Sequence, residues 1–168
     1  MDASYYLFIP LLILASVGQA AFLPWVRLGG VVPDVVLVLV MAWSLLRGVR
    51  HGLIWALIAG LILDALSAAP QGTFILALAV ASLTCSVGAV NFFRSGVLLP
   101  MAGALLGVFA YYVVFLLIIY LAGRPVVVGD VLTRVFLPAL IVNPVLMVPV
   151  FPLLRYLHRV IDYREISW

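Results

Sequence analysis

The fold is decided by residues 31–46, which read VVPDVVLVLVMAWSLL and are followed by the short polar stretch RGVRH at residues 47–51. Within the apolar stretch, Asp34 is the charged residue. A run rich in valine can form a strand, but the strands of membrane barrels alternate apolar and polar residues over about 10 positions. This stretch does not alternate, so we expect it to be a helix that enters a bilayer.

Further apolar segments lie on both sides of this stretch, and together they predict a bundle of six membrane-spanning helices. A bilayer core of about 30 Å requires about 20 apolar residues in a helix. The first segment has no basic residue before Arg27, which argues against a cleaved signal peptide. We therefore expect residues 1–168 to form a single all-α transmembrane domain. Its expected spans are residues 5–26, 31–46, 52–69, 73–90, 97–122 and 135–154.

The composition excludes several classes of protein. Of the 168 residues, 67% are hydrophobic and 9% are charged, whereas a soluble domain carries about 25% charged residues. All nine basic residues are arginine, which excludes lysine catalysis and a P-loop. A single cysteine allows neither an internal disulfide nor a multi-thiolate metal site. No segment has the basic density that nucleic-acid binding needs. We expect no enzymatic activity, cofactor or metal.

The arginines predict the orientation of the bundle. With six spans, both termini share one side with the connections that follow the second and fourth spans. That side holds six arginines and the other side three. Because basic residues concentrate in cytoplasmic loops, we expect both termini and a tail at residues 155–168 in the cytoplasm. Arg155 and Arg159 are spaced as in a short amphipathic helix on anionic lipid, and a docking site for a cytoplasmic partner is the alternative.

Asp34 and Asp64 are the charged residues inside the expected spans. An ionisable group in a membrane is costly and therefore marks a candidate site. The helical rise places both carboxylates at nearly the same level, about 18 to 20 Å from the cytoplasmic helix ends. Asp34 follows Pro33 and fits a carboxylate at a helix start, with Asp64, Arg27 or Arg134 as alternative buried partners. For Asp64 we expect a structural polar cluster first and contact with an ion or substrate second.

Small residues mark two places where helices are expected to approach closely. Gly52, Ala56 and Gly60 recur every four residues in the third span, and Gly103 and Gly107 do so in the fifth. Such spacing lets helix backbones come into contact in a membrane. We expect these residues to pack the bundle, and a docking face for a helix of another chain is the alternative.

The sixth span is rich in proline and contains Pro138, Pro144, Pro149 and Pro152. Each proline inside a helix removes one backbone hydrogen bond and can kink the helix. Asn143 directly precedes the second of them. We expect its side chain to bond to a freed carbonyl or to a neighbouring helix, with a ligand site at a broken helix as the alternative.

The order of these landmarks along the chain is distinctive. Pro33-Asp34 opens the second span, GLILDALS at residues 60–67 leads to PQG at residues 70–72, and PLLR at residues 152–155 closes the last span. This order resembles the MreD family of bacterial rod-shape-determining membrane proteins. The resemblance implies a non-enzymatic scaffold in the cytoplasmic (inner) membrane, within the machinery that elongates the cell.

The resemblance also implies partners for the chain. They are MreC, a single-span protein with an extracytoplasmic domain, the RodA glycosyltransferase, a class B penicillin-binding transpeptidase and, indirectly, MreB filaments. The family bundle is similar to the substrate-binding S-components of energy-coupling-factor vitamin transporters, which supplies an alternative function. However, the outer connections of this chain are short and carry few polar groups, whereas a selective pocket needs placed polar groups. We therefore expect the scaffold.

Overall fold

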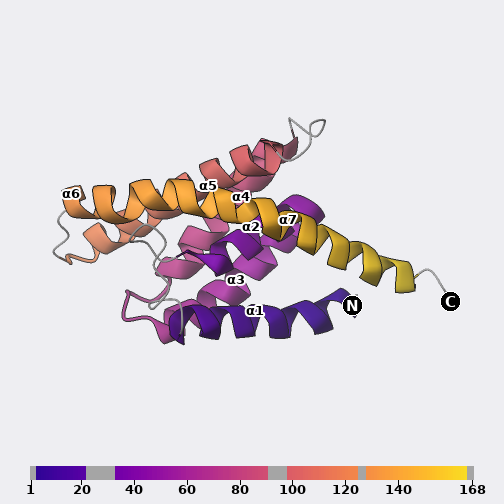
Figure 1. The fold of residues 1–168 in the computed structure, drawn as a ribbon. Coiled ribbons are helices and arrows are strands. Elements are labelled where there is room, and N and C mark those ends of the chain that lie inside the picture. The colour runs from indigo at the N-terminus through magenta and orange to yellow at the C-terminus, as the bar shows by residue number, and fades with distance from the viewer. Residues whose placement is uncertain (1–2, 22–32, 91–97, 125–127, 166–168) are drawn as a thin grey trace.

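The computed structural model describes residues 3–21, 33–90, 98–124 and 128–165. These residues form helices and turns and contain no strand, which confirms the expected all-α fold. The elements, shown in Figure 1, are α1 (Ala3–Ala21), α2 (Val35–Arg47), α3 (Val49–Leu66), α4 (Thr73–Val90), α5 (Leu98–Leu121), α6 (Val128–Val131), the π-helical segment η2 (Leu132–Phe136) and α7 (Leu137–Glu165).

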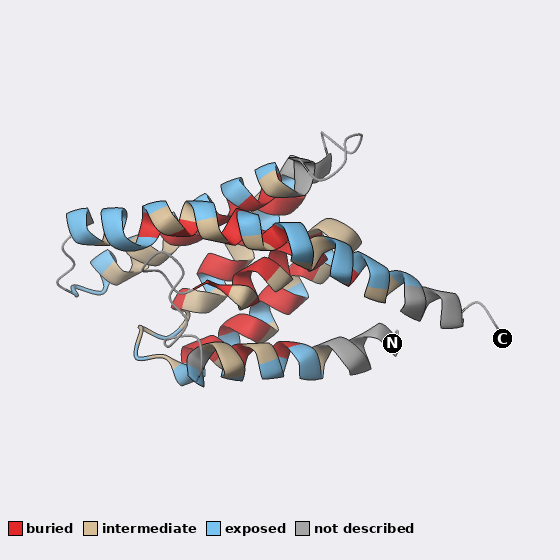
Figure 2. Cartoon of the chain, in the orientation of Figure 1, coloured by how far each residue is buried: buried red, intermediate tan, exposed pale blue. Residues whose placement is uncertain are grey.

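The short helix α2 lies at the centre of the bundle, where it packs against α1, α3, α4, α5 and α7. Between Val36 and Ser44, every residue except Leu39 is buried. A helix that is apolar on all sides must be covered on all sides, and the sequence of α2 is apolar almost throughout. Figure 2 accordingly shows the buried residues concentrated in the middle of the bundle.

The outer helices turn large apolar side chains outward. Leu14 of α1, Leu61 of α3, Leu121 of α5 and Ile141 of α7 are each at least 65% exposed. Soluble monomers rarely expose apolar surface on this scale. Three stretches of the described residues are long and apolar enough to cross a membrane, and three shorter apolar stretches accompany them. The long stretches are Val49–Leu66, Met101–Leu121 and Gly129–Arg159, and the shorter ones are Ile9–Gln19, Val35–Arg47 and Thr73–Val87.

The bundle has two chemically different ends. The N-terminal end of α1, the turn between α2 and α3, and the C-terminal part of α7 lie together, and we call this the terminal end (Figure 1). Gly48 makes the turn between α2 and α3 in a single residue, with a φ of 86° that side chains rarely adopt. The start of α2, the turn between α3 and α4, and α6 lie toward the opposite end.

The last helical run begins earlier than residue 135, where the sequence placed the start of the sixth span. α6 and η2 lead directly into α7, so the chain is helical from Val128 to Glu165. The Thr133 hydroxyl donates to the Gly129 carbonyl at 2.8 Å, and Arg134 lies 3.6 Å from Asp130, which favours helix in this segment. The helix passes through three prolines without a break, curves along its length and includes the tail up to Glu165 (Figure 1).

Candidate functional site

Asp34 caps the N-terminus of the central helix. Its Oδ1 atom accepts a hydrogen bond from the backbone N–H of Leu37 at 2.9 Å. The first N–H groups of a helix have no partner within the helix, and a carboxylate placed there satisfies one of them and interacts favourably with the helix dipole. Asp34 is only 7% exposed, so this capping takes place inside the bundle.

The partners of Asp34 come from three other helices. Gln19 of α1 donates from Nε2 to Asp34 Oδ1 at 2.9 Å and accepts at Oε1 from the Val36 N–H at 2.8 Å. Asn143 of α7 accepts at Oδ1 from the Asp34 N–H at 2.9 Å. Tyr111 of α5 is buried beside the Asp34 carboxylate. We call Gln19, Asp34, Tyr111 and Asn143 the Asp34 cluster.

None of the charged side chains considered as alternative partners of Asp34 pairs with it among the described residues. Arg134 instead pairs with Asp130 at 3.6 Å on the exposed surface, and Asp64 bonds to backbone groups elsewhere. Arg27 lies outside the described residues. The groups on Asp34 are uncharged because amides and a hydroxyl fit between apolar helices at a lower desolvation cost than a guanidinium.

Asp64, near the C-terminus of α3, binds the start of the neighbouring helix α4. Its Oδ1 atom accepts from the Phe74 N–H at 3.0 Å, and its Oδ2 atom accepts from the N–H groups of Gly72 at 3.1 Å and Ile75 at 3.3 Å. These are N–H groups that the first turn of α4 leaves unpaired. Asp64 therefore joins two consecutive helices by capping the second from the first.

Both small-residue motifs face the inside of the bundle. A Cβ atom on Gly60 would lie 2.5 Å from the Ile75 Cα, and one on Gly52 would meet the side chains of Ser44 and Ser82. A Cβ atom on Gly107 would lie 2.5 Å from the Met41 sulfur. These three glycines thus allow α3 to approach α2 and α4, and α5 to approach α2.

Gly103 occupies a looser position than the other three glycines. A Cβ atom there would lie 3.4 Å from the Cys85 sulfur, an ordinary contact distance. In the second motif, therefore, a side chain would clash with a neighbouring helix at Gly107 but not at Gly103, although the spacing suggested close packing at both.

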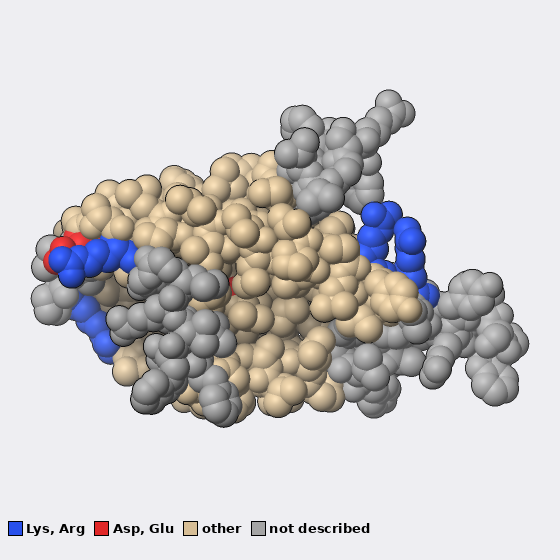
Figure 3. All heavy atoms as spheres, in the orientation of Figure 1, with Lys and Arg blue, Asp and Glu red and all other residues tan. Residues whose placement is uncertain are grey.

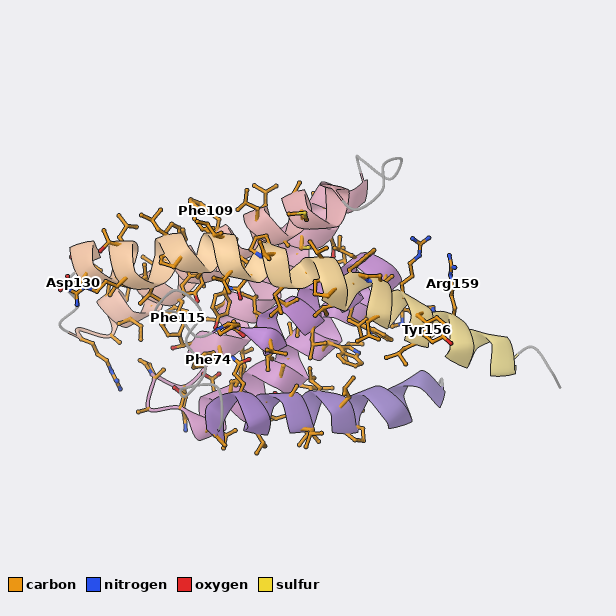
Figure 4. The ribbon with its side chains drawn as sticks, in the orientation of Figure 1. Phe74, Phe109, Phe115, Asp130, Tyr156 and Arg159 are labelled. Atoms are coloured by element: carbon orange, nitrogen blue, oxygen red, sulfur yellow. The ribbon has the colours of Figure 1, made fainter. Side chains whose placement is uncertain are left out.

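Asn143 and Arg155 lie on α7 in opposite environments. Asn143 is fully buried, and its Nδ2 group has no hydrogen-bond partner among the described residues. Arg155 is exposed at the terminal end, one turn before Arg159, which Figure 4 labels beside Tyr156. The two residues therefore belong to different features, one to the Asp34 cluster and the other to the basic terminal end.

The comparison with protein-family models matches residues 1–161 to the rod shape-determining protein MreD. The chain belongs to the MreD family. The match covers nearly the whole described fold and confirms the resemblance inferred from the order of the landmarks. Neither curated proteins nor solved structures gave a significant match. The similarity to vitamin-transporter S-components therefore rests on the sequence-based resemblance alone.

The sequence did not identify Gln19 as part of the central site of this MreD protein. Its amide uses both its donor and its acceptor to join α1 to α2. The available signal was an amide side chain in an otherwise apolar helix, since such a group must find a partner in a membrane.

A second polar contact that the sequence did not reveal lies beneath Gly52. The Ser44 hydroxyl donates to the Ser82 carbonyl at 3.0 Å, the Ser86 hydroxyl donates to the same carbonyl at 2.8 Å, and the Ser44 and Ser86 hydroxyls are in contact. These three serines join α2 to α4 where a small residue of α3 leaves room. Serine is so common in membrane helices that its presence alone does not predict such a cluster.

The described residues contain no group of three or more His, Cys, Asp or Glu side chains placed to hold a metal ion. A cavity of about 500 Å³ lies along α7 and is lined by Ile141, Val142, Val145, Leu146, Val148 and Pro149. Its lining is apolar, and no member of the Asp34 cluster belongs to it.

Proposed function

We propose that this MreD-family chain is a non-enzymatic membrane scaffold of the cell-elongation complex. In this proposal it lies in the inner membrane, binds MreC and supports peptidoglycan synthesis and the control of cell shape. RodA and a class B penicillin-binding transpeptidase are further partners, and MreB filaments act through them. Membership in the family supports the role in rod shape, and the helical, apolar chain supports the membrane location.

The observation that carries the scaffold proposal is how the buried polar groups are used. The carboxylates of Asp34 and Asp64 accept hydrogen bonds from the first N–H groups of α2 and α4. The Gln19 amide uses both its donor and its acceptor at the start of α2. A selective transport site needs polar groups that converge on a cavity, whereas these groups converge on helix ends. This arrangement supports a scaffold whose helices are held in fixed positions relative to one another.

The orientation proposed here places the terminal end in the cytoplasm. Arg47, Arg50, Arg155 and Arg159 lie at that end, and Arg124 and Arg134 lie at the opposite end. Figure 3 shows basic side chains at both extremes of the molecule, and at the opposite end an acidic residue accompanies them. The positive-inside rule favours the end with more arginines as the cytoplasmic one.

The contact with MreC is proposed to use lipid-facing helix surfaces. The glycines most suited to close helix contact, Gly52, Gly60 and Gly107, are already occupied within the chain. A helix of another chain must therefore pack against exposed apolar side chains, which every outer helix of the bundle provides.

Affinity purification in mild detergent from native membranes tests this proposal when proteins and released small molecules are identified together. We expect MreC and the elongation synthases to co-purify, without a stoichiometric metabolite. A tagged multi-span protein of unrelated function, expressed at the same level, is the control for non-specific recovery. Recovery of paired ATPases, a coupling membrane subunit and a bound vitamin would show the transporter subunit instead.

A further inference from the structure

The two ends of the bundle differ in net charge. The segments that lead to the terminal end contain six arginines and three carboxylates, whereas the remaining segments contain three of each. At the opposite end, Asp34 and Asp64 cap helices, and Asp130 pairs with Arg134. At the terminal end, by contrast, Arg50, Arg155 and Arg159 are exposed and form no ion pair with a described carboxylate.

Aromatic contacts bring the arginine-bearing segments of the terminal end together. Trp43 of α2 lies 5.8 Å, between ring centroids, from His158 of α7 and stacks on Trp55 of α3 at 4.8 Å. The Arg47 guanidinium carbon lies 5.8 Å from the centre of the Trp43 ring. The C-terminal part of α7 is thus held against the C-terminal part of α2, and Arg155 and Arg159 lie at the same end of the bundle as Arg50.

Arg155 and Arg159 follow directly after the apolar part of α7. Leu153 is 59% exposed, as a lipid-facing side chain would be, and Leu154 is buried in the bundle. Tyr156 is 66% exposed. Tyrosine and tryptophan prefer the level of the lipid headgroups, and arginine extends its charged group to the same level. Figure 4 shows Tyr156 and Arg159 together on this part of α7. In a bilayer that covers the apolar part of α7, the guanidinium groups of Arg155 and Arg159 would therefore reach the level of the lipid phosphates.

We propose that the terminal end binds the phosphates of anionic phospholipids through Arg50 at the start of α3 and through Arg155 and Arg159 on the C-terminal part of α7. Guanidinium groups bind phosphate oxygens in pairs of parallel hydrogen bonds, and the anionic lipids of the cytoplasmic leaflet attract basic residues beside a membrane span. The exposed apolar side chains just before Arg155 accompany the acyl chains. This inference relies on the proposed orientation of the bundle and not on the binding of MreC.

The full chain tests the proposal after reconstitution into nanodiscs of phosphatidylcholine with or without phosphatidylglycerol. Native mass spectrometry measures the retained lipids, and thermal unfolding measures Tm. We expect wild type to retain phosphatidylglycerol selectively and to gain Tm in its presence. The triple variant R50Q/R155Q/R159Q is expected to retain about tenfold less phosphatidylglycerol, because three positive charges near the leaflet are lost.

Two matched variants separate the site from general charge. R124Q/R134Q lowers the charge at the opposite end and is expected to retain phosphatidylglycerol as wild type does. R50K/R155K/R159K keeps the charge and is expected to retain more of the lipid than the glutamine variant. The proposal is overturned if the triple glutamine variant retains the lipid like wild type, or if R124Q/R134Q loses it equally.

Inorganic phosphate, added to the detergent-purified chain, distinguishes a lipid from a soluble anion. We expect it to leave Tm unchanged, and an increase equal to that caused by phosphatidylglycerol would overturn the lipid as the ligand. Recovery of MreC with the triple glutamine variant is measured in parallel. Loss of lipid with MreC retained supports the inference independently of the scaffold function, and loss of MreC with lipid retained overturns the inference while leaving the scaffold function standing.

Discussion

The backbone N–H of Asp34 donates to the side-chain oxygen of Asn143 at 2.9 Å across a separation of 109 residues. This bond joins the first turn of the central helix α2 to the middle of α7. In a membrane no water is available to replace it, so the N–H group at the start of α2 depends on a residue far along the chain. The proline after Asn143 does not break α7, which presents the amide to α2 from a continuous helix.

Replacing Asn143 with alanine is expected to destabilise the bundle by about 1–3 kcal/mol, because the buried Asp34 N–H would lose its acceptor. Thermal unfolding in detergent measures the change. V145A on the same helix is the control, since Val145 is 57% exposed and lies outside the cluster. Equal Tm values for N143A and V145A would contradict the structural role of this amide.

Replacing Asp64 with alanine is expected to cost about 1–2 kcal/mol or more, because the start of α4 would lose acceptors for three N–H groups. D64N keeps one acceptor oxygen and should lie between wild type and D64A. The control is D130N, which breaks an exposed ion pair of the kind that contributes less than about 1 kcal/mol. Thermal unfolding of the three variants gives the order, and a D64A variant as stable as D130N would contradict the capping role.

The same Asp64 variants distinguish a structural role from a transport role. We expect D64N to lower the amount of MreC that co-purifies or to cause loss of the rod shape of the cells. Any small-molecule binding should stay unchanged, because the carboxylate faces helix N–H groups. A bound metabolite that disappears in D64N but persists in D130N would argue for transport.

The two small-residue motifs are expected to respond differently to a single added methyl group. In G60A the new Cβ would lie 2.5 Å from the Ile75 Cα, so backbone must move, and overpacking of this kind costs about 1–3 kcal/mol. In G103A the nearest atom is at 3.4 Å, and alanine is the better helix former by about 1 kcal/mol. G103A is therefore expected to match or exceed wild type in Tm, and G60A to fall below it.

Larger side chains extend this comparison to assembly. G60L and G107L should both reduce accumulation and co-purification of partners, because their side chains would displace α4 and Met41. Normal accumulation and normal recovery of both variants would contradict the close packing of these helices.

Much of this architecture follows from local sequence features. The all-α fold and the cap position of Asp34 rest on apolar length and on Pro33-Asp34, which act over a few residues. The partners of Asp34 could not be predicted in the same way, because Gln19 and Asn143 reach it only after the helices have packed. The sequence favoured a helix cap and offered charged side chains as alternative partners, because charge is easy to recognise there, whereas amides carry a weaker signal.

The remaining difference concerns where helices begin. The run of valine and glycine before residue 135 suggested a connection, yet Val128–Val131 is helical and leads through η2 into α7. Helix propensity in this segment is low, and the exposed i,i+4 ion pair between Arg134 and Asp130 adds only a small contribution in favour of helix.

The Gln19 amide offers the sharpest test of the Asp34 cluster, because two substitutions separate hydrogen bonding from charge. Q19L removes both bonds to the start of α2 and should destabilise the bundle by about 1–3 kcal/mol.

Q19E keeps an acceptor for the Val36 N–H but places a second carboxyl group beside Asp34. Two adjacent carboxyl groups are favourable when they share one proton and repel when both are ionised. The Tm of Q19E in detergent, compared with that of wild type at the same pH, should therefore fall as pH rises. S16A, one turn earlier on α1, is the control, since the Ser16 hydroxyl bonds within its own helix at 2.8 Å. A Q19E variant whose Tm tracks wild type across the pH range would show that the introduced carboxyl group does not meet Asp34, and the cluster as described would be wrong.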